Sequence, residues 1–221
     1  VVARVYTETE AQAARLMPVE VKADTGKKLL CPMPGLVISI DVTQEGYALG
    51  YVFDIVLGVE SVNLSAFKTG TRAPGAGSDV REWVPLDLMK REGSAGQDPQ
   101  EQKIRRFPGD AGLLAAAHAA RDRYVRGRVV DGVIGSSDMW NSELDRIQWF
   151  HDRFGTTTEE MEAAAAAQIA GAYGVPFLGI RILSNNITND GAYDGTTGEA
   201  CQDYVFDVVR TWIRSTKAQG R

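Results

Sequence analysis

The sequence predicts an α/β fold: a single domain with a mixed, mostly parallel β-sheet flanked by helices. The chain has 221 residues, of which 44% are hydrophobic and 24% are charged, a composition typical of one mid-sized globular domain. After residue 110, apolar β-branched runs alternate with amphipathic or alanine-rich stretches. A succession of strand, helix, helix, strand and helix is typical of an α/β sheet.

The elements before residue 110 are short. A helix is predicted over Glu8–Met17, and compact β-branched runs predict buried strands over Leu36–Ile40 and Tyr51–Leu57. Glycine, proline and small polar residues over 69–78 predict a surface loop. The polar stretch Lys90–Pro108 predicts a second loop.

The elements after residue 110 have clearer boundaries. Ser142 is a predicted N-cap and Gly155 a predicted C-cap of one helix, and Thr197 is a predicted cap of the last helix. The predicted elements are a helix over Asp110–Tyr124, a strand over Gly127–Ile134, a helix over Ser142–Phe154, a helix over Glu159–Tyr173, a strand over Val175–Leu183 and a helix over Gly198–Thr216.

Polar side chains follow two of the predicted strands. Ser136–Asn141 contains Trp140 among polar residues, and Ser184–Asn186 follows the later strand. In open α/β sheets, ligands bind at the carboxyl ends of the strands. The two segments therefore predict a small-molecule pocket built from polar groups beside an aromatic ring.

Composition excludes several classes of function. With 24 basic and 29 acidic residues the net charge is −5, so the chain lacks the broad basic surface that duplex nucleic acid requires. No run of about 18 apolar residues predicts a membrane span. The two cysteines, and an N-terminus without a signal-peptide pattern, favour a cytoplasmic location. Both histidines fall in predicted helices and no P-loop is present, so we expect neither a metal site nor a cofactor.

The acidic stretch before the alanine run has two interpretations. Glu159 and Glu160 suit the positive end of a helix dipole, and that structural role is sufficient for both. Glu162 precedes five alanines, which allow a helix to approach a sheet closely and draw this carboxylate inward. A buried carboxylate needs hydrogen-bond donors, and sugar hydroxyls are suitable ones. Glu162 is therefore a candidate ribose clamp.

Several motifs together resemble a known superfamily. Glu160-Met-Glu-Ala-Ala-Ala, followed by Val175-Pro-Phe-Leu-Gly-Ile-Arg-Ile-Leu-Ser184, resembles the signature of the nucleoside phosphorylase/nucleosidase superfamily, and most of all its methylthioadenosine/S-adenosylhomocysteine nucleosidases. Gly135–Trp140, Phe53–Val56 and Ser65–Phe67 resemble three further stretches of that family. The resemblance runs from about Val52 to Trp212 and implies a fold of the nucleoside phosphorylase type and a homodimer.

The resemblance implies hydrolytic cleavage of the N-glycosidic bond of a purine nucleoside or 5′-thionucleoside, with release of the free base. On the ribose side it implies that Glu162 binds the 2′- and 3′-hydroxyls, that Met161 contacts the sugar, and that Arg181 braces the site. Glu162 would hold the sugar through an oxocarbenium-like transition state. It also implies that Phe67 reaches the pocket of a neighbouring subunit.

On the base side the resemblance implies that Trp140 stacks on the purine and that the backbone of its neighbours Met139 and Asn141 reads the base edge. Ser184 and Asn185 would face N7 and the 6-substituent, with Asn185 as the catalytic group. The family has Asp where this chain has Asn185. An amide donates a hydrogen bond but has no proton to give, which favours 6-oxopurines over adenine.

Other departures from the family keep two alternatives open. The family's glycine-rich loop is replaced by Ile40–Tyr47, which contains Asp41 and Glu45 and is a poor anion nest, so phosphorolysis is disfavoured. The family's water-activating Glu has no match in residues 1–35, so we expect residues 1–50 of this single domain to be diverged or incomplete. A phosphate-dependent purine nucleoside phosphorylase and a non-catalytic nucleoside-binding or storage relative remain alternatives to the nucleosidase.

Overall fold

The computed structural model describes residues 38–39, 50–87, 89–90 and 103–218. The predicted helix over Glu8–Met17 and the segment Ile40–Tyr47 lie outside these ranges. Of the predicted strand Leu36–Ile40, only β1 (Ile38–Ser39) is described.

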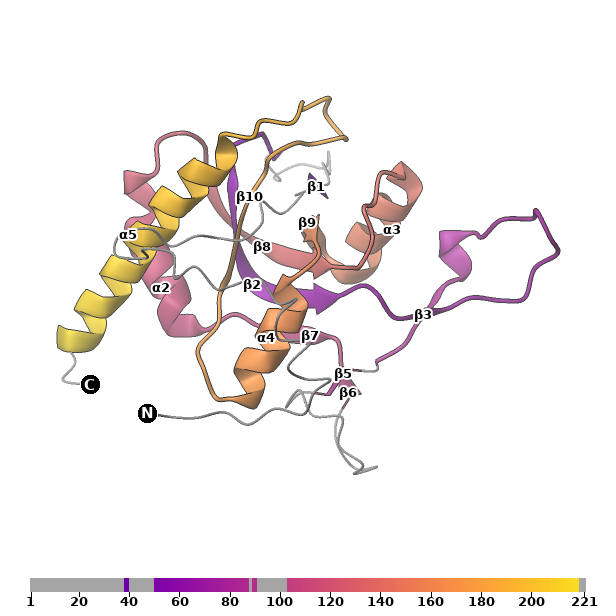
Figure 1. The fold of residues 1–221 in the computed structure, drawn as a ribbon, viewed down its shortest axis with the longest axis horizontal. Helices are drawn as coiled ribbons and strands as arrows, with labels where there is room; N and C mark the ends of the chain where they lie inside the picture. The colour runs from indigo at the N-terminus through magenta and orange to yellow at the C-terminus, as the bar shows by residue number, and fades with distance from the viewer. Residues whose placement is uncertain (1–37, 40–49, 88, 91–102, 219–221) are drawn as a thin grey trace, which may run out of the picture. The chain divides into compact units, whose positions relative to one another are not determined.

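A mixed β-sheet organises the described residues (Figure 1). Its strand order is β1-β9-β8-β2-β10, with β7 beside the second half of β2. The longest register, β2 with β8, is parallel, as is that of β8 with β9, while β1, β7 and β10 pair antiparallel. The predicted mixed, mostly parallel sheet is therefore confirmed. Besides β1, the strands are β2 (Ile55–Asn63), β7 (Arg106–Pro108), β8 (Val129–Ser136), β9 (Thr156–Glu160) and β10 (Gly179–Ile182).

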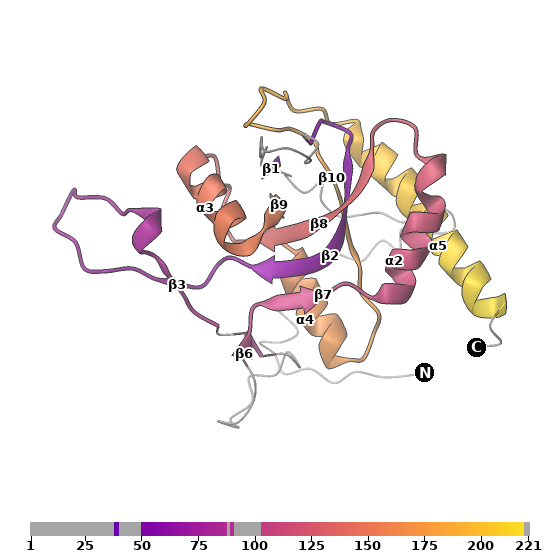
Figure 2. The ribbon, with the colours of Figure 1, turned by 180° about the vertical axis from the view of Figure 1, so that it is seen from behind.

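Helices cover both faces of the sheet. Helices α2 and α5 lie side by side against one face, and α4 lies against the opposite face (Figures 1 and 2). Successive side chains of a strand point to opposite faces, so Ile55 and Leu57 of β2 pack with α2 and α5, whereas Val56 packs with Ala163 of α4. The helices are α2 (Ala111–Ala120), α3 (Leu144–Phe154), α4 (Ala163–Ala172) and α5 (Thr197–Ala218).

Short elements lie between β2 and α2 and directly after α2. Residues 69–78 are exposed and form no strand or helix, as expected for the predicted surface loop. The predicted loop Lys90–Pro108 is wrong in part, because β7 joins the main sheet by pairing with β2. The short elements are β3 (Phe67–Lys68), η1 (Val80–Glu82), β4 (Val84–Pro85), β5 (Met89–Lys90), β6 (Lys103–Ile104) and η2 (Arg121–Arg123).

The predicted strand Tyr51–Leu57 begins too early. Phe53 has a φ of 77°, a left-handed conformation that a strand does not accommodate. The buried carboxylate of Asp54 accepts hydrogen bonds from the backbone N–H of Tyr51 at 3.0 Å and of Arg128 at 2.7 Å. This turn delays the start of β2 to Ile55, and the strand then continues to Asn63.

The predicted helix Glu159–Tyr173 is wrong at its start. Thr156–Glu160 form strand β9, and α4 begins at Ala163. Three consecutive threonines lose side-chain freedom in a helix and favour a strand. The two glutamates at the end of the threonine run therefore belong to the sheet.

The other boundaries shift by a few residues. Glu143, not Ser142, stands at the N-cap of α3 and makes no side-chain cap bond. The C-cap at Gly155 is confirmed, with a φ of 74°. The helix predicted over Asp110–Tyr124 ends earlier, at Ala120, and is followed by η2, and the strand predicted over Val175–Leu183 shortens to β10.

The direction of β10 overturns the expectation that the two polar segments meet at one edge of the sheet. Ile182, at the end of β10, pairs with Ile55 at the start of β2. Ser136, at the end of β8, pairs with Asn63 at the end of β2. Because β10 is antiparallel to β2, the carboxyl ends of β8 and β10 lie at opposite ends of β2.

Candidate active site

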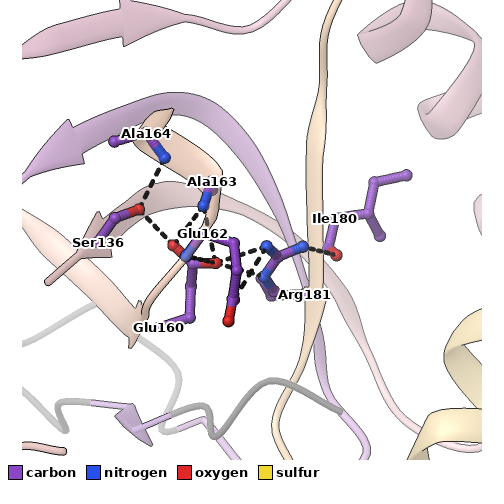
Figure 3. A network of polar contacts seen from close by, with 7 residues as sticks. All are labelled: Ser136, Glu160, Glu162, Ala163, Ala164, Ile180 and Arg181. Atoms are coloured by element: carbon purple, nitrogen blue, oxygen red, sulfur yellow. Dashed lines mark hydrogen bonds and ion pairs between the residues drawn. The ribbon is translucent and has the colours of Figure 1, made fainter. Parts of the chain in front are cut away.

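The junction between β9 and α4 holds a buried carboxylate surrounded by donors (Figure 3). Glu160 is only 3% exposed. Its carboxylate accepts hydrogen bonds from the backbone N–H of Glu162 at 3.0 Å and of Ala163 at 2.9 Å. Arg181 of β10 donates to the same carboxylate through Nε at 3.0 Å and Nη2 at 2.5 Å.

Ser136 of β8 completes this network. Its hydroxyl donates to Glu160 and accepts from the backbone N–H of Ala164 at 2.8 Å. The first N–H groups of a helix have no partner within the helix, and the positive end of the dipole favours an anion. Glu160 and Ser136 together satisfy these groups at the start of α4.

Glu160 is ionised at neutral pH. Burial alone raises the pKa of its carboxyl, but the Arg181 guanidinium, the Ser136 hydroxyl and the Ala163 N–H stabilise the anion. Their combined effect holds the pKa of Glu160 below its ordinary value.

Glu162 lies on the open side of the same junction. Its side chain is 44% exposed, and one carboxylate oxygen is 3.8 Å from Nη2 of Arg181. Partial burial, together with the hydrogen bond and negative charge of Glu160, raises the pKa of Glu162, and Arg181 opposes that rise. Arg181 thus bridges a buried and an accessible carboxylate, and only the accessible one has room to accept hydrogen bonds from a ligand. Met161, between the two glutamates, is also exposed.

The segment after β8 reaches the same junction. The backbone N–H of Ser137 donates to the carbonyl of Glu160 at 2.9 Å. Trp140, three residues on, is 65% exposed, and Met139 is exposed as well. The structure therefore brings the aromatic segment beside Glu160, and through it beside Glu162 and Arg181.

Asn141 has a different environment from its neighbours. It is buried, and its Nδ2 donates to Oε2 of Glu159 at 3.0 Å. Burial raises the pKa of Glu159 to about 7, although Asn141 and Arg146 lower it. Arg146 of α3 is also buried, and its guanidinium carbon lies 4.4 Å from the centre of the Trp83 ring. Its Nη1 donates to the sulfur of Met139.

Ser184 and Asn185 lie at the other end of β2. Ser184 is buried, its hydroxyl donates to Oδ1 of Asn185 at 3.3 Å, and its carbonyl accepts from the N–H of Asp194 at 2.8 Å. Leu183 exchanges backbone hydrogen bonds with Phe53 and Asp54. Among the described residues, no hydrogen bond joins Asn185 to the segment of Trp140. The two are connected through strand β10, which precedes Asn185 and carries Arg181 to the β9–α4 junction.

Phe67 packs within its own chain. Its ring lies 5.6 Å from Trp83 and from Trp149, and 5.7 Å from Phe150. The residue is half-buried in this aromatic cluster. The structure therefore places Phe67 away from the β9–α4 junction.

The sequence predictions missed Glu160 and Glu159 as members of polar networks. The sequence pattern indicates only a helix-dipole role for both. The signal that could have found them is the run of three threonines before them, which favours a strand. In a strand, neighbouring side chains point to opposite faces, so the two glutamates would enter different networks. Glu160 indeed contacts Ser136 and α4, whereas Glu159 contacts Asn141.

Within residues 38–39, 50–87, 89–90 and 103–218, no three His, Cys, Asp or Glu side chains are grouped as metal ligands. In the same ranges, no helix combines the length and hydropathy needed to cross a membrane.

Comparisons with curated proteins give two kinds of match. The chain is 36% identical over 94 residues to the 5′-methylthioadenosine/S-adenosylhomocysteine nucleosidase of Shewanella halifaxensis, a match that covers 42% of this chain and 41% of that protein. A 50-residue stretch is 52% identical to the propionyl-CoA carboxylase alpha chain of Ruegeria pomeroyi, covering 20% of this chain and 7% of that one. The chain therefore matches less than half the length of either relative.

Solved structures share the fold. Futalosine hydrolase of Helicobacter pylori aligns with a TM-score of 0.56 at 16% identity, over 80% of this chain and 66% of that chain. The 5′-methylthioadenosine/S-adenosylhomocysteine nucleosidase of Neisseria meningitidis, solved with methylthio-immucillin-A, aligns with a TM-score of 0.51 at 23% identity, over 82% and 68%.

The model of the phosphorylase superfamily also matches this chain. It covers residues 46–214, a range that includes the β9–α4 junction, the Trp140 segment and β10. The signature residues noted in the sequence lie inside that range. The chain belongs to the phosphorylase superfamily.

Proposed function

We propose that this chain hydrolyses the N-glycosidic bond of a purine nucleoside or 5′-thionucleoside and releases the free purine. The observation that carries the proposal is the β9–α4 junction, where Arg181 bridges buried Glu160 and accessible Glu162 beside the exposed ring of Trp140. The nucleosidases among the curated relatives support the same reaction class.

The ribose binds at Glu162 in this proposal. A carboxylate accepts two hydrogen bonds at once, which suits the neighbouring 2′- and 3′-hydroxyls of a ribose. Arg181 keeps the Glu162 carboxylate oriented, and Met161 lies against the sugar. As the N-glycosidic bond breaks, positive charge develops on the sugar, and the negative charge of Glu162 stabilises that oxocarbenium-like state.

The purine stacks on Trp140, between Met139 and the Asn141 backbone. The family resemblance assigns Ser184 and Asn185 to N7 and the 6-substituent, where their hydrogen bonds would partly neutralise the negative charge of the leaving base. Because the register of β10 puts them at the other end of β2 from the end of β8, this assignment requires the two segments to approach each other around the base. Water then adds to the anomeric carbon, and the released base takes up a proton. Asn185 supports a preference for 6-oxopurines, because its amide donates a hydrogen bond to a carbonyl oxygen.

A homodimer forms part of the proposal and rests on family resemblance alone. Phe67 would contribute to the partner's pocket only if its ring left the aromatic cluster of its own chain. Sedimentation of the purified chain at several concentrations tests the dimer directly.

Release of free base from a panel of nucleosides tests the reaction class. The panel contains methylthioadenosine, S-adenosylhomocysteine, adenosine, inosine and guanosine, each incubated with and without phosphate and analysed by chromatography. Release that does not need phosphate supports the nucleosidase. Release only with phosphate identifies a phosphorylase, and binding by thermal shift without release identifies a non-catalytic binder.

Asn185→Asp is expected to shift base preference toward adenine. An aspartic acid can donate a proton toward N7, whereas its carboxylate repels a 6-oxo oxygen. We expect the ratio of kcat/KM for adenosine to that for inosine to rise about tenfold, the contribution of about one hydrogen bond. Each substrate serves as the control for the other, since a general loss of folding lowers both rates equally. An unchanged ratio would remove Asn185 from the base site.

A further inference from the structure

We propose that Glu159 is a positioning residue that sets the direction of Trp140 through its hydrogen bond to Asn141. This inference rests on the proposed function, because it assumes that Met139–Asn141, here called the base-stacking segment, contacts the purine. Glu159 itself points to the face of the sheet opposite Glu160 and Arg181, so it acts on the base only through the segment.

Three contacts hold the base-stacking segment in place. Asn141 Nδ2 donates to Glu159 at 3.0 Å, and Asn141 Oδ1 accepts from the backbone N–H of Glu143 at 3.4 Å. Arg146 donates through Nη1 to the sulfur of Met139. Met139 and Asn141 are thus tied down on either side of Trp140, whose ring stays 65% exposed.

The environment of Glu159 is not that of a residue whose only role is packing. The residue is 3% exposed, and its Oε1 has no hydrogen-bond partner among the described residues. A buried carboxylate with a single hydrogen bond costs stability, and an apolar side chain of similar size would pack there without that cost. What the carboxylate supplies is an acceptor aimed at the Asn141 amide.

The strength of that acceptor changes near neutral pH. Burial raises the pKa of Glu159 to about 7, against the effects of Asn141 and Arg146. The charged groups that act on this site are Arg146 of α3 and, through Arg146, the exposed Glu143. An ionised carboxylate accepts a stronger hydrogen bond than a protonated one. The base-stacking segment is therefore held more firmly at pH 8 than at pH 6.

Equilibrium dialysis of free adenine and hypoxanthine tests this proposal at pH 6, 7 and 8. The wild-type chain is compared with Glu159→Gln and Glu159→Leu, and with Asp152→Asn as a matched control that removes an exposed carboxylate of α3 outside this network. KM and kcat for the preferred nucleoside are measured on the same proteins. Free base is used because it contacts the base-stacking segment without the ribose contacts of Glu162.

We expect the affinity of the wild type for free base to rise about threefold from pH 6 to pH 8, and the affinity of Asp152→Asn to rise by the same factor. Glu159→Gln keeps an uncharged acceptor, so it should remove this rise. Glu159→Leu leaves the Asn141 amide without its acceptor and should weaken base binding about tenfold at every pH, raising KM while kcat changes little.

Thermal unfolding separates positioning from folding. Between the ordinary pKa of a Glu and its raised value, the folded chain binds a proton that the unfolded chain does not, so wild-type stability falls as the pH rises toward 7. Glu159→Gln should remove that fall. If Glu159→Leu does not fold, the pH profile of base affinity in Glu159→Gln is by itself sufficient to test the proposal.

Two sets of results would overturn the inference. One is a Glu159→Gln profile with the wild-type rise in base affinity. The other is a Glu159→Leu variant whose thermal stability changes while its base affinity and KM stay as in the wild type. That result would leave Glu159 with a structural role only. A wild type that neither binds base nor cleaves nucleosides contradicts the proposed function itself, and the inference with it.

Discussion

Glu162→Ala is expected to lower kcat/KM for purine ribonucleosides about a hundredfold to a thousandfold. Each hydrogen bond to an ionised group contributes about 1.5–3 kcal/mol, and two ribose hydroxyls would lose their acceptor. The lower part of the range applies, because the Glu162 side chain is 44% exposed and water competes for it. The stability of the fold should change little, since Glu162 stands at the N-cap of α4 without a side-chain cap bond, and the first N–H groups there donate to Glu160.

A substrate without one hydroxyl makes this test specific. The wild type should prefer adenosine over 2′-deoxyadenosine more strongly than Glu162→Ala does, because the variant has no carboxylate to which the 2′-hydroxyl could donate. Glu199→Ala, at an exposed glutamate in the first turn of α5, serves as the control and should keep wild-type rates. Equal discrimination in both proteins would show that Glu162 does not bind the 2′-hydroxyl.

Arg181→Met is expected to lower the free energy of unfolding by about 3 kcal/mol at pH 7. Removing one partner of a buried ion pair leaves the other charge without compensation, and the Glu160 side chain is fully buried while that of Arg181 is 23% exposed. Urea denaturation measures the loss. Arg214→Met removes an exposed arginine of α5 and should change stability by less than about 0.5 kcal/mol.

The pH dependence of that loss has a definite sign. In the wild type the pKa of Glu160 lies below its ordinary value, so its contribution is present above the unfolded pKa and disappears as the pH falls through the folded pKa. Without Arg181, burial raises the pKa of Glu160, and protonation at pH 5 relieves the uncompensated charge. The deficit should therefore be smaller at pH 5 than at pH 7. A deficit that is the same at both pH values would assign the effect to packing of the arginine stem.

Some elements are determined by local chemistry and could be predicted from the sequence. The left-handed C-cap at Gly155 and the amphipathic α5 follow from residue type and spacing alone. The start of β2 could not be predicted, because the turn before it depends on hydrogen bonds that Arg128, more than seventy residues away, donates to Asp54. An apolar run marks a strand without giving the contacts that end it.

The sequence by itself determined the α/β class, the order of most helices and strands, and the residue types that resemble a nucleoside site. The tertiary structure alone decided that Glu160 is the buried anion and Glu162 the accessible one, since strand alternation and the start of α4 assign the two carboxylates to different environments. It also decided that β10 is antiparallel to β2, which separates Asn185 from the end of β8. Strand direction depends on which partners pair across the sheet, and periodicity within one strand is the same in both directions.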